Sequence, residues 1–255
     1  MNAPTSTLSG GSTLEPMVRK LEYHGAFSDS DRAAVLALPF TLKTMERHHF
    51  VVRERELANH SSVLLSGTAV RSKIVATGHR QILSIHIRGE TVDLQNSLLR
   101  VADHSVEMIT AGRIAAIPRC EMTRLAFERP AIGTAMWKET LVDASIFREW
   151  LTNVGRRDAR TRIAHLLCEF SLRLKVAEMG EHNGYELPMS QEQLGDATGL
   201  TSMHVNRTLK ALERDGLIER LHPRSIHIGD WRKLAEAGDF DSGYLHLRSD
   251  EPALN

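Results

Sequence analysis

The sequence predicts an α+β protein with a β-rich N-terminal half, one long central helix and a C-terminal winged helix-turn-helix. Three observations support this fold class. Short apolar runs separated by turn residues fill positions 41–120. An apolar heptad pattern follows over 130–154, and two short helical patterns joined by a glycine lie within 190–216.

The composition is that of a globular protein kept in a reducing compartment. Hydrophobic residues make up 42% of the chain and charged residues 25%, and the formal net charge is zero. Only Cys120 and Cys168 are present, which excludes a disulfide scaffold and a multi-cysteine metal or iron–sulfur site. No apolar run is long enough to span a bilayer, and the N-terminus has no signal-peptide pattern. We therefore expect a cytoplasmic protein with no membrane contact, no metal and no cofactor.

The N-terminal half begins with a helical segment over 17–38, which Pro39 ends and whose second part Asp29 or Ser30 can cap. The segment "VATGHRQI" predicts a hairpin that turns at Thr77-Gly78. Short strands at this spacing are typical of a sandwich or a barrel. Between the last two strands, "RGETVDLQNSLLRVADHS" predicts a short helix and a loop. The predicted strands lie in "HHFVVR", "SSVLLSGTAVRSKIVA", "RQILSIHI" and "RIAAIP".

The long helix carries apolar or small residues at alternating spacings of four and three, which is the pattern of a coiled-coil seam. Such a face either packs on the β-rich half of its own chain or joins two chains as a dimer. We favour the dimer because a second apolar face is available for the β-rich half. We expect Gly155 to break the helix. The second face consists of Ile132, Met136, Ile146 and Trp150, and the predicted dimer interface of Trp137, Thr140, Ala144, Phe147, Leu151 and Val154.

The segment from 190 to 228 has the order helix, turn, helix and wing. Ser190 and Gln193 fit a capping box at the start of the first helix. Gly199 can close that helix, and Thr201 can cap the next one. After Gly216, "LIERLHPRSIHI" predicts two strands around a turn, which is a wing. This order is more specific than any one of its parts and predicts a winged helix-turn-helix.

The second of these helices, Thr201–Gly216, carries polar side chains that a protein core does not need. Between 201 and 233 there are seven Lys and Arg residues and four acidic residues, so this region is modestly basic. A helix that enters the major groove reads bases through side chains near its N-terminus. Arg207 can donate two hydrogen bonds to guanine, whereas Lys210 and Arg224 suit phosphates. The predicted DNA-binding residues are Ser202, Met203, His204, Asn206, Arg207, Lys210 and Arg224.

The chain resembles the Crp/Fnr family of bacterial transcription regulators from about residue 17 onward. The resemblance rests on "GHRQILSIHIRGE", "REWLTNVGRRDARTRIAHLLCE" and "MSQEQLGDATGLTSMHVNRTLKALERDGLIE". It implies a cyclic-nucleotide-binding-like β-roll (jelly roll), a dimerisation helix, a homodimer on double-stranded DNA with a palindromic operator, and contact with RNA polymerase. The domains we expect are a disordered tail over 1–16, a β-roll sensor domain over 17–129, a dimerisation helix over 130–155, a winged helix-turn-helix DNA-binding domain over 156–235, and a C-terminal tail over 236–255.

Departures from the family pattern carry information of their own. Cyclic-AMP-binding members use a Glu for the ribose and an Arg-Ser/Thr pair for the phosphate, and here Leu94 and His104-Ser105 stand at those positions. Without that arginine a phosphate loses a bidentate partner, so cyclic AMP is not the expected effector. An unidentified small-molecule effector remains open. Both well-known branches carry Glu-x-x-[Ser/Gly]-Arg in the recognition helix, whereas this chain has Met203 in place of the glutamate. We assign the sensor pocket to Glu90, Asp93, His104 and Ser105.

Several other residues and segments each allow two interpretations. Histidines of the N-terminal half, such as His48, His49, His79 and His86, suit haem ligation or, as we prefer, ordinary surface and strand positions. Cys168 is either a redox switch or, as its apolar neighbours favour, a buried structural cysteine. For the cluster "RRDAR" at 156–160 we prefer a solvated helix start or a salt-bridging hub to a phosphate contact. The alternative function is a regulatory module that binds a cyclic nucleotide or another small ligand without reading DNA. An enzyme is not expected, because no catalytic motif is present.

Overall fold

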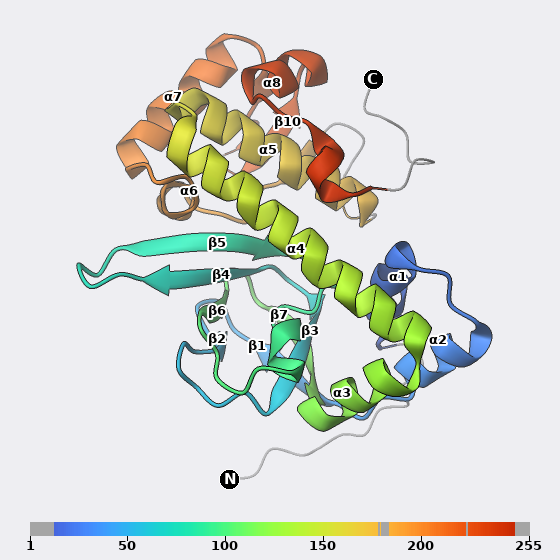
Figure 1. Ribbon diagram of the computed structural model, residues 1–255. Coiled ribbons are helices and arrows are strands. Elements are labelled where there is room, and N and C mark those ends of the chain that lie inside the picture. The colour runs from blue at the N-terminus through green and yellow to red at the C-terminus, as the bar shows by residue number, and fades with distance from the viewer. Residues whose placement is uncertain (1–12, 178, 180–183, 223, 248–255) are drawn as a thin grey trace. The chain divides into compact units, whose positions relative to one another are not determined.

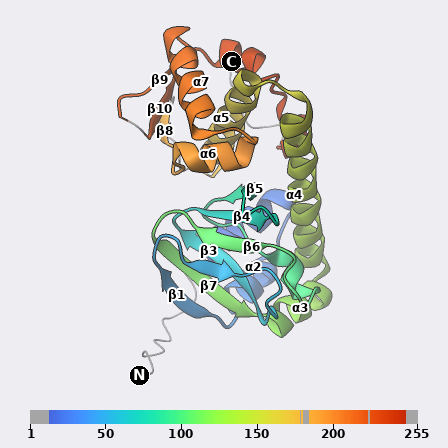
Figure 2. The same ribbon diagram turned by 90° about the vertical axis from the view of Figure 1, so that its left-hand side faces the viewer.

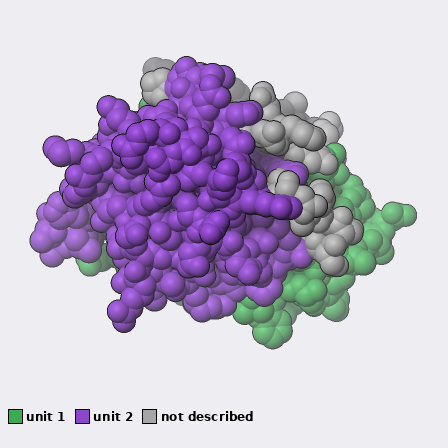
Figure 3. Space-filling view, turned by 90° about the horizontal axis from the view of Figure 1, so that it is seen from above, with its two compact units in different colours: residues 1–73, 85–143 green, residues 74–84, 144–255 purple. Residues whose placement is uncertain are grey.

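The computed structural model describes residues 13–177, 179, 184–222 and 224–247, which form two compact units (Figure 3). The first unit comprises residues 1–73 and 85–143, and the second comprises 74–84 and 144–255. Most of the disordered tail predicted over 1–16, namely 1–12, and the end of the C-terminal tail, 248–255, lie outside the described residues. No helix in the described parts of the chain is long and apolar enough to cross a membrane.

The first unit is a β-sandwich with helices at its margin, so the β-rich prediction is confirmed (Figures 1 and 2). One sheet has the strand order β1-β7-β3 and the other β2-β6-β4-β5. Its elements are α1 (Glu15–His24), α2 (Asp29–Leu36), β1 (Thr41–Met45), β2 (Phe50–Val52), β3 (His60–Ser66), β4 (Ala69–Ile74), the end of β5 (Arg80–His86), whose residues 80–84 are counted with the second unit, the 3-10 helix η1 (Leu94–Ser97), β6 (Ser105–Met108), β7 (Gly112–Pro118), α3 (Arg119–Glu128) and the first half of α4 (Pro130–Arg156).

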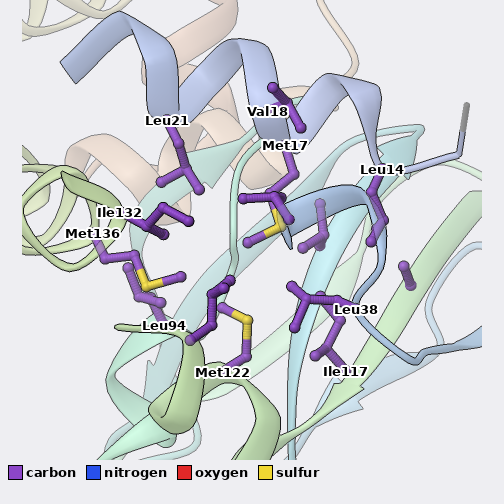
Figure 4. Packing of buried hydrophobic residues seen from close by; sticks show 14 of the residues in the cluster. Leu14, Met17, Val18, Leu21, Leu38, Leu94, Ile117, Met122, Ile132 and Met136 are labelled. Carbon is purple, nitrogen blue, oxygen red and sulfur yellow. The ribbon is translucent and has the colours of Figure 1, made fainter. Parts of the chain in front are cut away.

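Alternating side chains of the first sheet build two cores, because successive residues of a strand point to opposite faces. Leu64 of β3 packs with residues of the second sheet such as Val106. Its neighbours Val63 and Leu65 pack on the other side with α1, α3 and α4 (Figure 4). Strand β3 and the middle of β7 are therefore buried on both faces, and the helices complete the outer core.

The N-terminal helical segment differs from the prediction in two places. It is divided into α1 and α2, and the cap of α2 is Ser28 rather than Asp29 or Ser30. Ser28 Oγ accepts the N–H of Asp31 at 3.2 Å, and the Asp31 carboxylate accepts the N–H of Ser28 at 3.1 Å. The disordered tail predicted over 1–16 is wrong for residues 14–16, since Leu14 is fully buried in the core and α1 begins at Glu15.

The predicted hairpin is confirmed, because β4 and β5 are neighbours and Gly78 adopts a left-handed φ of 85° at the turn. Three elements were not predicted. β1 is a largely exposed edge strand, β6 is short and contains the buried Glu107, and α3 carries only two buried residues, Met122 and Leu125. None of the three shows a strong apolar period, which is the signal on which such predictions depend.

The second unit contains the end of α4 and the C-terminal elements. Helix α4 continues to Arg156, so Gly155 lies within its last turn instead of breaking it. Asp158 then caps the next helix by accepting the N–H of Thr161 at 2.9 Å. The following elements are α5 (Ala159–Val176), β8 (Gly184–Glu186), α6 (Gln191–Thr198), α7 (Ser202–Arg214), β9 (Ile218–Glu219), β10 (Ser225–Ile228), α8 (Trp231–Ala237) and the 3-10 helix η2 (Ser242–Leu245).

Two parts of this unit depart from the prediction. Strand β8, which lies between α5 and α6, was not predicted; it pairs with β10 in a three-stranded sheet of order β8-β10-β9. Tyr185 of β8 is buried and donates its hydroxyl to the carbonyl oxygen of Leu167 at 3.0 Å. Part of the C-terminal tail predicted over 236–255 folds into η2, whose Leu245 is buried. Both segments are ordered by contacts with residues that are distant in sequence.

Candidate nucleic-acid interface

Two helix caps and one glycine turn define the helix-turn-helix, and the structure confirms all three predicted features. Ser190 and Gln193 form the capping box of α6, with the N–H of Ser190 donating to Gln193 Oε1 at 2.8 Å. Gly199 ends α6 in the left-handed conformation with φ of 67°. Thr201 caps α7 by accepting the N–H of His204 at 3.3 Å. Together they define a tight turn and leave the first turn of α7 at the surface.

Helix α7 has one buried and one exposed face. Val205, Leu209 and Leu212 are buried and hold it on the domain. Met203 is 80% exposed, an unusual position for a large apolar side chain. Five more of the predicted DNA-binding side chains are exposed, namely Ser202, His204, Arg207, Lys210 and Arg224.

An open groove of about 830 Å³ lies along the exposed face of α7. It brings together five of the six predicted DNA-binding residues that lie on α7. Gln191 at the start of α6 contributes to the same groove, as does Arg214 at the end of α7. The lining residues are Gln191, Ser202, Met203, Asn206, Arg207, Lys210, Ala211 and Arg214.

Asn206 is the one predicted DNA-binding residue of α7 that is half-buried and tied to another helix. Its Nδ2 donates to Gln191 Oε1 at 3.0 Å. The sequence prediction did not include Gln191, although its place at the first position of α6 sets it beside α7. Arg224 belongs to the wing between β9 and β10, and its neighbour Pro223 lies outside the described residues.

The acids at the end of α7 are engaged by arginines, which leaves its exposed face positive. Asp215 accepts from Arg160 at 2.6 Å, and this hydrogen bond holds the pKa of Asp215 below its usual value. The guanidinium of Arg220 lowers the pKa of Glu213 in the same way. The cluster at 156–160 is thus a salt-bridging helix start, since Arg157 also pairs with Glu149 and Asp239. A basic surface of this kind suits a polyanion.

Each of the four predicted sensor residues contacts different neighbours in the first unit. Glu90 is buried beside His86, with 3.3 Å between His86 Nδ1 and Glu90 Oε2. Asp93 accepts the N–H of Ser62 at 2.6 Å, and burial raises its pKa to about 6. His104 lies between Gln95 and Asp103, and burial lowers its pKa to about 4. Ser105 Oγ accepts the N–H of Glu54 at 3.0 Å.

Arg71 is a buried residue of this region that the sequence analysis missed. Its Nη1 donates to Asp143 Oδ2 of α4 at 2.6 Å, and its Nη2 donates to the carbonyl oxygen of Val92 at 3.1 Å. The available signal was an arginine inside the apolar strand "AVRSKI", because a buried charge requires partners.

No group of His, Cys, Asp and Glu in the described ranges has the arrangement of a metal site. Cys168 is fully buried, and burial raises its pKa.

The predicted dimer seam on α4 presents large apolar side chains to solvent. Trp137 is 70% and Leu151 is 75% exposed. The other predicted interface residues, Thr140, Ala144, Phe147 and Val154, are half-buried. The second apolar face is divided: Ile132 and Met136 enter the core of the first unit. Trp150 donates its Nε1 to Glu169 of α5 at 2.9 Å.

Comparison with known proteins shows which regulators this chain resembles. Residues 161–237 match the model of the Crp-like helix-turn-helix domain. The chain is 26% identical to the transcriptional activator protein FnrL of Cereibacter sphaeroides, over 85% of this chain and 88% of that relative. Residues 161–237 therefore form a Crp-like helix-turn-helix domain, and most of the chain is similar to the Crp/Fnr family of transcription regulators.

Other known proteins resemble most of this chain. The nitrogen fixation regulation protein FixK of Azorhizobium caulinodans is 24% identical over 78% of this chain and 79% of its own. The solved structure of FixK2 from Bradyrhizobium japonicum superposes with a TM-score of 0.73 at 23% identity, covering 78% of this chain and 98% of that one. A mutant of CooA from Carboxydothermus hydrogenoformans superposes with a TM-score of 0.64 at 16% identity, over 92% and 98% of the two chains. The predicted fold class is therefore confirmed, and the protein is a DNA-binding transcription regulator.

Proposed function

We propose that this regulator is a homodimer that binds a two-fold symmetric operator through α7, one helix for each half-site. The exposed face of α7 carries this proposal, since Arg207 and Lys210 line one groove with Met203 and Asn206. Arg207 pairs bidentately with a guanine, Asn206 contacts an adenine or a phosphate, and Met203 contacts a thymine methyl group. Ser202 and His204 complete the contacts of the first turn. Lys210 and Arg224 bind phosphates and give affinity without sequence information.

The two chains are joined along α4. The exposed Trp137 and Leu151 support this assignment, because large apolar side chains in a heptad pattern become buried when two helices pair. Two-fold symmetry of the protein then matches a palindromic operator. The functional organisation we propose is a sensor domain over 17–129, a dimerisation helix over 130–155 and a DNA-binding domain over 156–235.

A signal at the β-roll domain modulates DNA binding, and cyclic AMP is not that signal. The side chains of Asp93, His104 and Ser105 are engaged by Ser62, Gln95, Asp103 and Glu54, which supports a different effector or none. RNA polymerase is the proposed protein partner, the cytoplasm is the proposed location, and we assign the chain no catalytic activity. A ligand-binding module without DNA readout is not favoured, because the helix-turn-helix matches the Crp-like domain.

The decisive experiment compares two substitutions of exposed cations on α7. Operators are first selected by the wild-type protein from randomised inverted repeats and then used in mobility shifts. Arg207→Ala should lose on the order of 1–3 kcal/mol of discrimination at one base pair of each half-site. Lys210→Ala should weaken binding to all sequences alike and reduce its salt dependence. Unchanged base preference in Arg207→Ala would remove Arg207 from the readout, and absence of any selected sequence would refute the proposed function.

A further inference from the structure

The segment after α8 is folded onto the DNA-binding unit beyond the end of the helix-turn-helix match. The family model ends at residue 237, whereas the described chain continues through η2 to residue 247. Gly238 lies directly against α5, since a β-carbon on it would stand 2.7 Å from the backbone nitrogen of His165. This close approach starts a stretch, Asp239–His246, that we call the C-terminal strap.

The carboxylate of Glu169 joins three elements of this unit. Glu169 lies on α5 and is only 1% exposed. Its Oε2 accepts from Trp150 Nε1 of α4 at 2.9 Å and from the hydroxyl of Tyr244 in the strap at 2.8 Å. Arg173 of α5 donates to its Oε1 at 3.2 Å. A buried carboxylate is stable only while such donors are present, so α4, α5 and the strap depend on one another at this point.

Aromatic packing holds the strap on the same face of α5. The ring of His165 stacks on Tyr244 with 5.8 Å between centroids and meets the edge of Phe240 at 5.2 Å. His165 Nε2 lies 3.1 Å from the Tyr244 hydroxyl, and its Nδ1 lies 3.0 Å from the carbonyl oxygen of Gly238. Because a carbonyl oxygen only accepts, Nδ1 carries a hydrogen, which fixes the orientation of the ring.

The strap also contacts the joint between α4 and α5. Arg157 lies between the end of α4 and the capping residue of α5. Its Nε and Nη2 donate to Asp239 Oδ2 at 3.0 and 2.9 Å, and its Nη1 pairs with Glu149 of α4 at 2.7 Å. Near the other end of the strap, His246 Nε2 lies 3.3 Å from Ser145 Oγ of α4. The strap therefore touches α4, α5 and the two-residue connection between them.

Helix α5 in turn carries the helix-turn-helix. Arg162 Nη1 donates to the carbonyl oxygen of Thr198 at the end of α6, at 3.0 Å. Arg160 holds Asp215, which follows α7. Whatever fixes α5 on the end of α4 therefore also fixes α7 on the end of α4.

We propose that the C-terminal strap, acting through Tyr244 and Glu169, is a positioning element that sets the angle between α4 and α5. This inference rests on the proposed function, in which α4 joins two chains and each α7 reads one half-site. Binding to an isolated half-site requires only a folded α7. Binding to both half-sites at once also requires the two recognition helices to stand at the spacing of the operator. The strap contributes to the second requirement and not to the first.

The test compares two tyrosines that each lose only a hydroxyl group. Tyr244→Phe removes the hydrogen bond to Glu169 and the contact with His165 Nε2 but keeps the ring. Tyr185→Phe removes the hydrogen bond to Leu167 in the same unit, away from the strap. We expect Tyr244→Phe to bind the full palindrome about tenfold more weakly, while affinity for a single half-site changes by less than about twofold. It should also discriminate less against operators whose spacer is one base pair longer or shorter. Tyr185→Phe should leave the ratio of full-site to half-site affinity unchanged.

A second measurement does not depend on DNA. Amide hydrogen exchange over 150–165, the end of α4 and the start of α5, should be faster in Tyr244→Phe than in Tyr185→Phe or the wild type. Equal loss of full-site and half-site affinity, or unchanged exchange over this stretch, would overturn the positioning role. A wild-type protein that does not prefer a palindrome to a half-site would instead refute the proposed function, while the exchange result would still decide whether the strap holds the joint.

Discussion

The backbone of Gly195 in α6 is in contact with the backbone of Leu200 in the turn before α7. Leu200 donates its N–H to the carbonyl oxygen of Gly195 at 3.0 Å. A β-carbon at position 195 would lie 2.4 Å from the carbonyl oxygen of Leu200. The two helices of the helix-turn-helix are therefore packed as closely as a residue without a side chain permits.

Gly195→Ala should destabilise the DNA-binding unit. The clash is with backbone, so the turn must shift, and the expected cost is about 1–3 kcal/mol despite the better helix propensity of alanine. Thermal or urea unfolding measures this cost. Gly155→Ala is the matched control, because nothing lies within 4 Å of the added β-carbon in α4. That variant should gain about 0.5–1 kcal/mol. Equal effects of the two substitutions would contradict the packing argument.

The seam on α4 gives a prediction about oligomeric state. Leu151→Glu places a charge where a second chain should cover an apolar side chain, so it should shift the protein toward the monomer in sedimentation velocity. The isolated fold should be unaffected, because Leu151 is exposed in the single chain. Thr152→Glu adds the same charge one residue away, on the solvent side of the heptad pattern. A Leu151→Glu protein that remains as dimeric as Thr152→Glu would refute the seam.

Asp93 should make the first unit less stable at neutral pH than at mildly acidic pH. Burial raises its pKa to about 6, against an ordinary value of 3.8. The native state therefore binds more protons than the unfolded state between these values, and stability is gained as the pH falls from 6 toward 4. The charged form costs on the order of 3 kcal/mol at pH 7.

Asp93→Asn isolates this effect. The asparagine oxygen can still accept the N–H of Ser62, but it carries no charge. The stability difference between the variant and the wild type in urea unfolding should be largest at pH 7 and should nearly vanish at pH 4. The buried His86 and His104 titrate in both proteins, so their contributions cancel. A difference that grows as the pH falls would contradict the shift.

Met203 should determine where the operator departs from those of relatives with a glutamate at this position. Met203→Glu introduces an acceptor that pairs with the amino group of cytosine, so selection from randomised half-sites should yield a changed base at one position. Met203→Leu keeps an apolar side chain and should keep the wild-type preference. Identical selected sequences from Met203→Glu and Met203→Leu would show that residue 203 does not contact a base.

Local features of the fold could be predicted from the sequence. The turn between α6 and α7 is encoded by Ser190, Gly199 and Thr201, each of which acts within three or four residues of its own position. The hairpin at Gly78 is of the same kind. Caps, tight turns and apolar periods are short-range properties, and they brought most of the predicted residues of α7 into one groove.

Features that depend on distant contacts could not be predicted in this way. Strand β8 forms because Tyr185 reaches α5, and the strap folds because Tyr244 reaches Glu169 across 75 positions of the sequence. Arg71 is buried because it meets Asp143 of α4, 72 positions away. Nothing near these residues indicates their partners. Helix α7 could therefore be predicted from the sequence, whereas the residues that orient it could not.

The hydrogen bond between Asn206 and Gln191 bears on how a base would be recognised. It uses one of the two hydrogens on Nδ2 and leaves the other, together with Oδ1, able to form the paired contact with an adenine. It also fixes which edge of the amide carries the donor. The base preference at that position of the half-site would then depend on residues of both α6 and α7. If Gln191→Leu left the preference intact, Asn206 would be assigned to a phosphate instead.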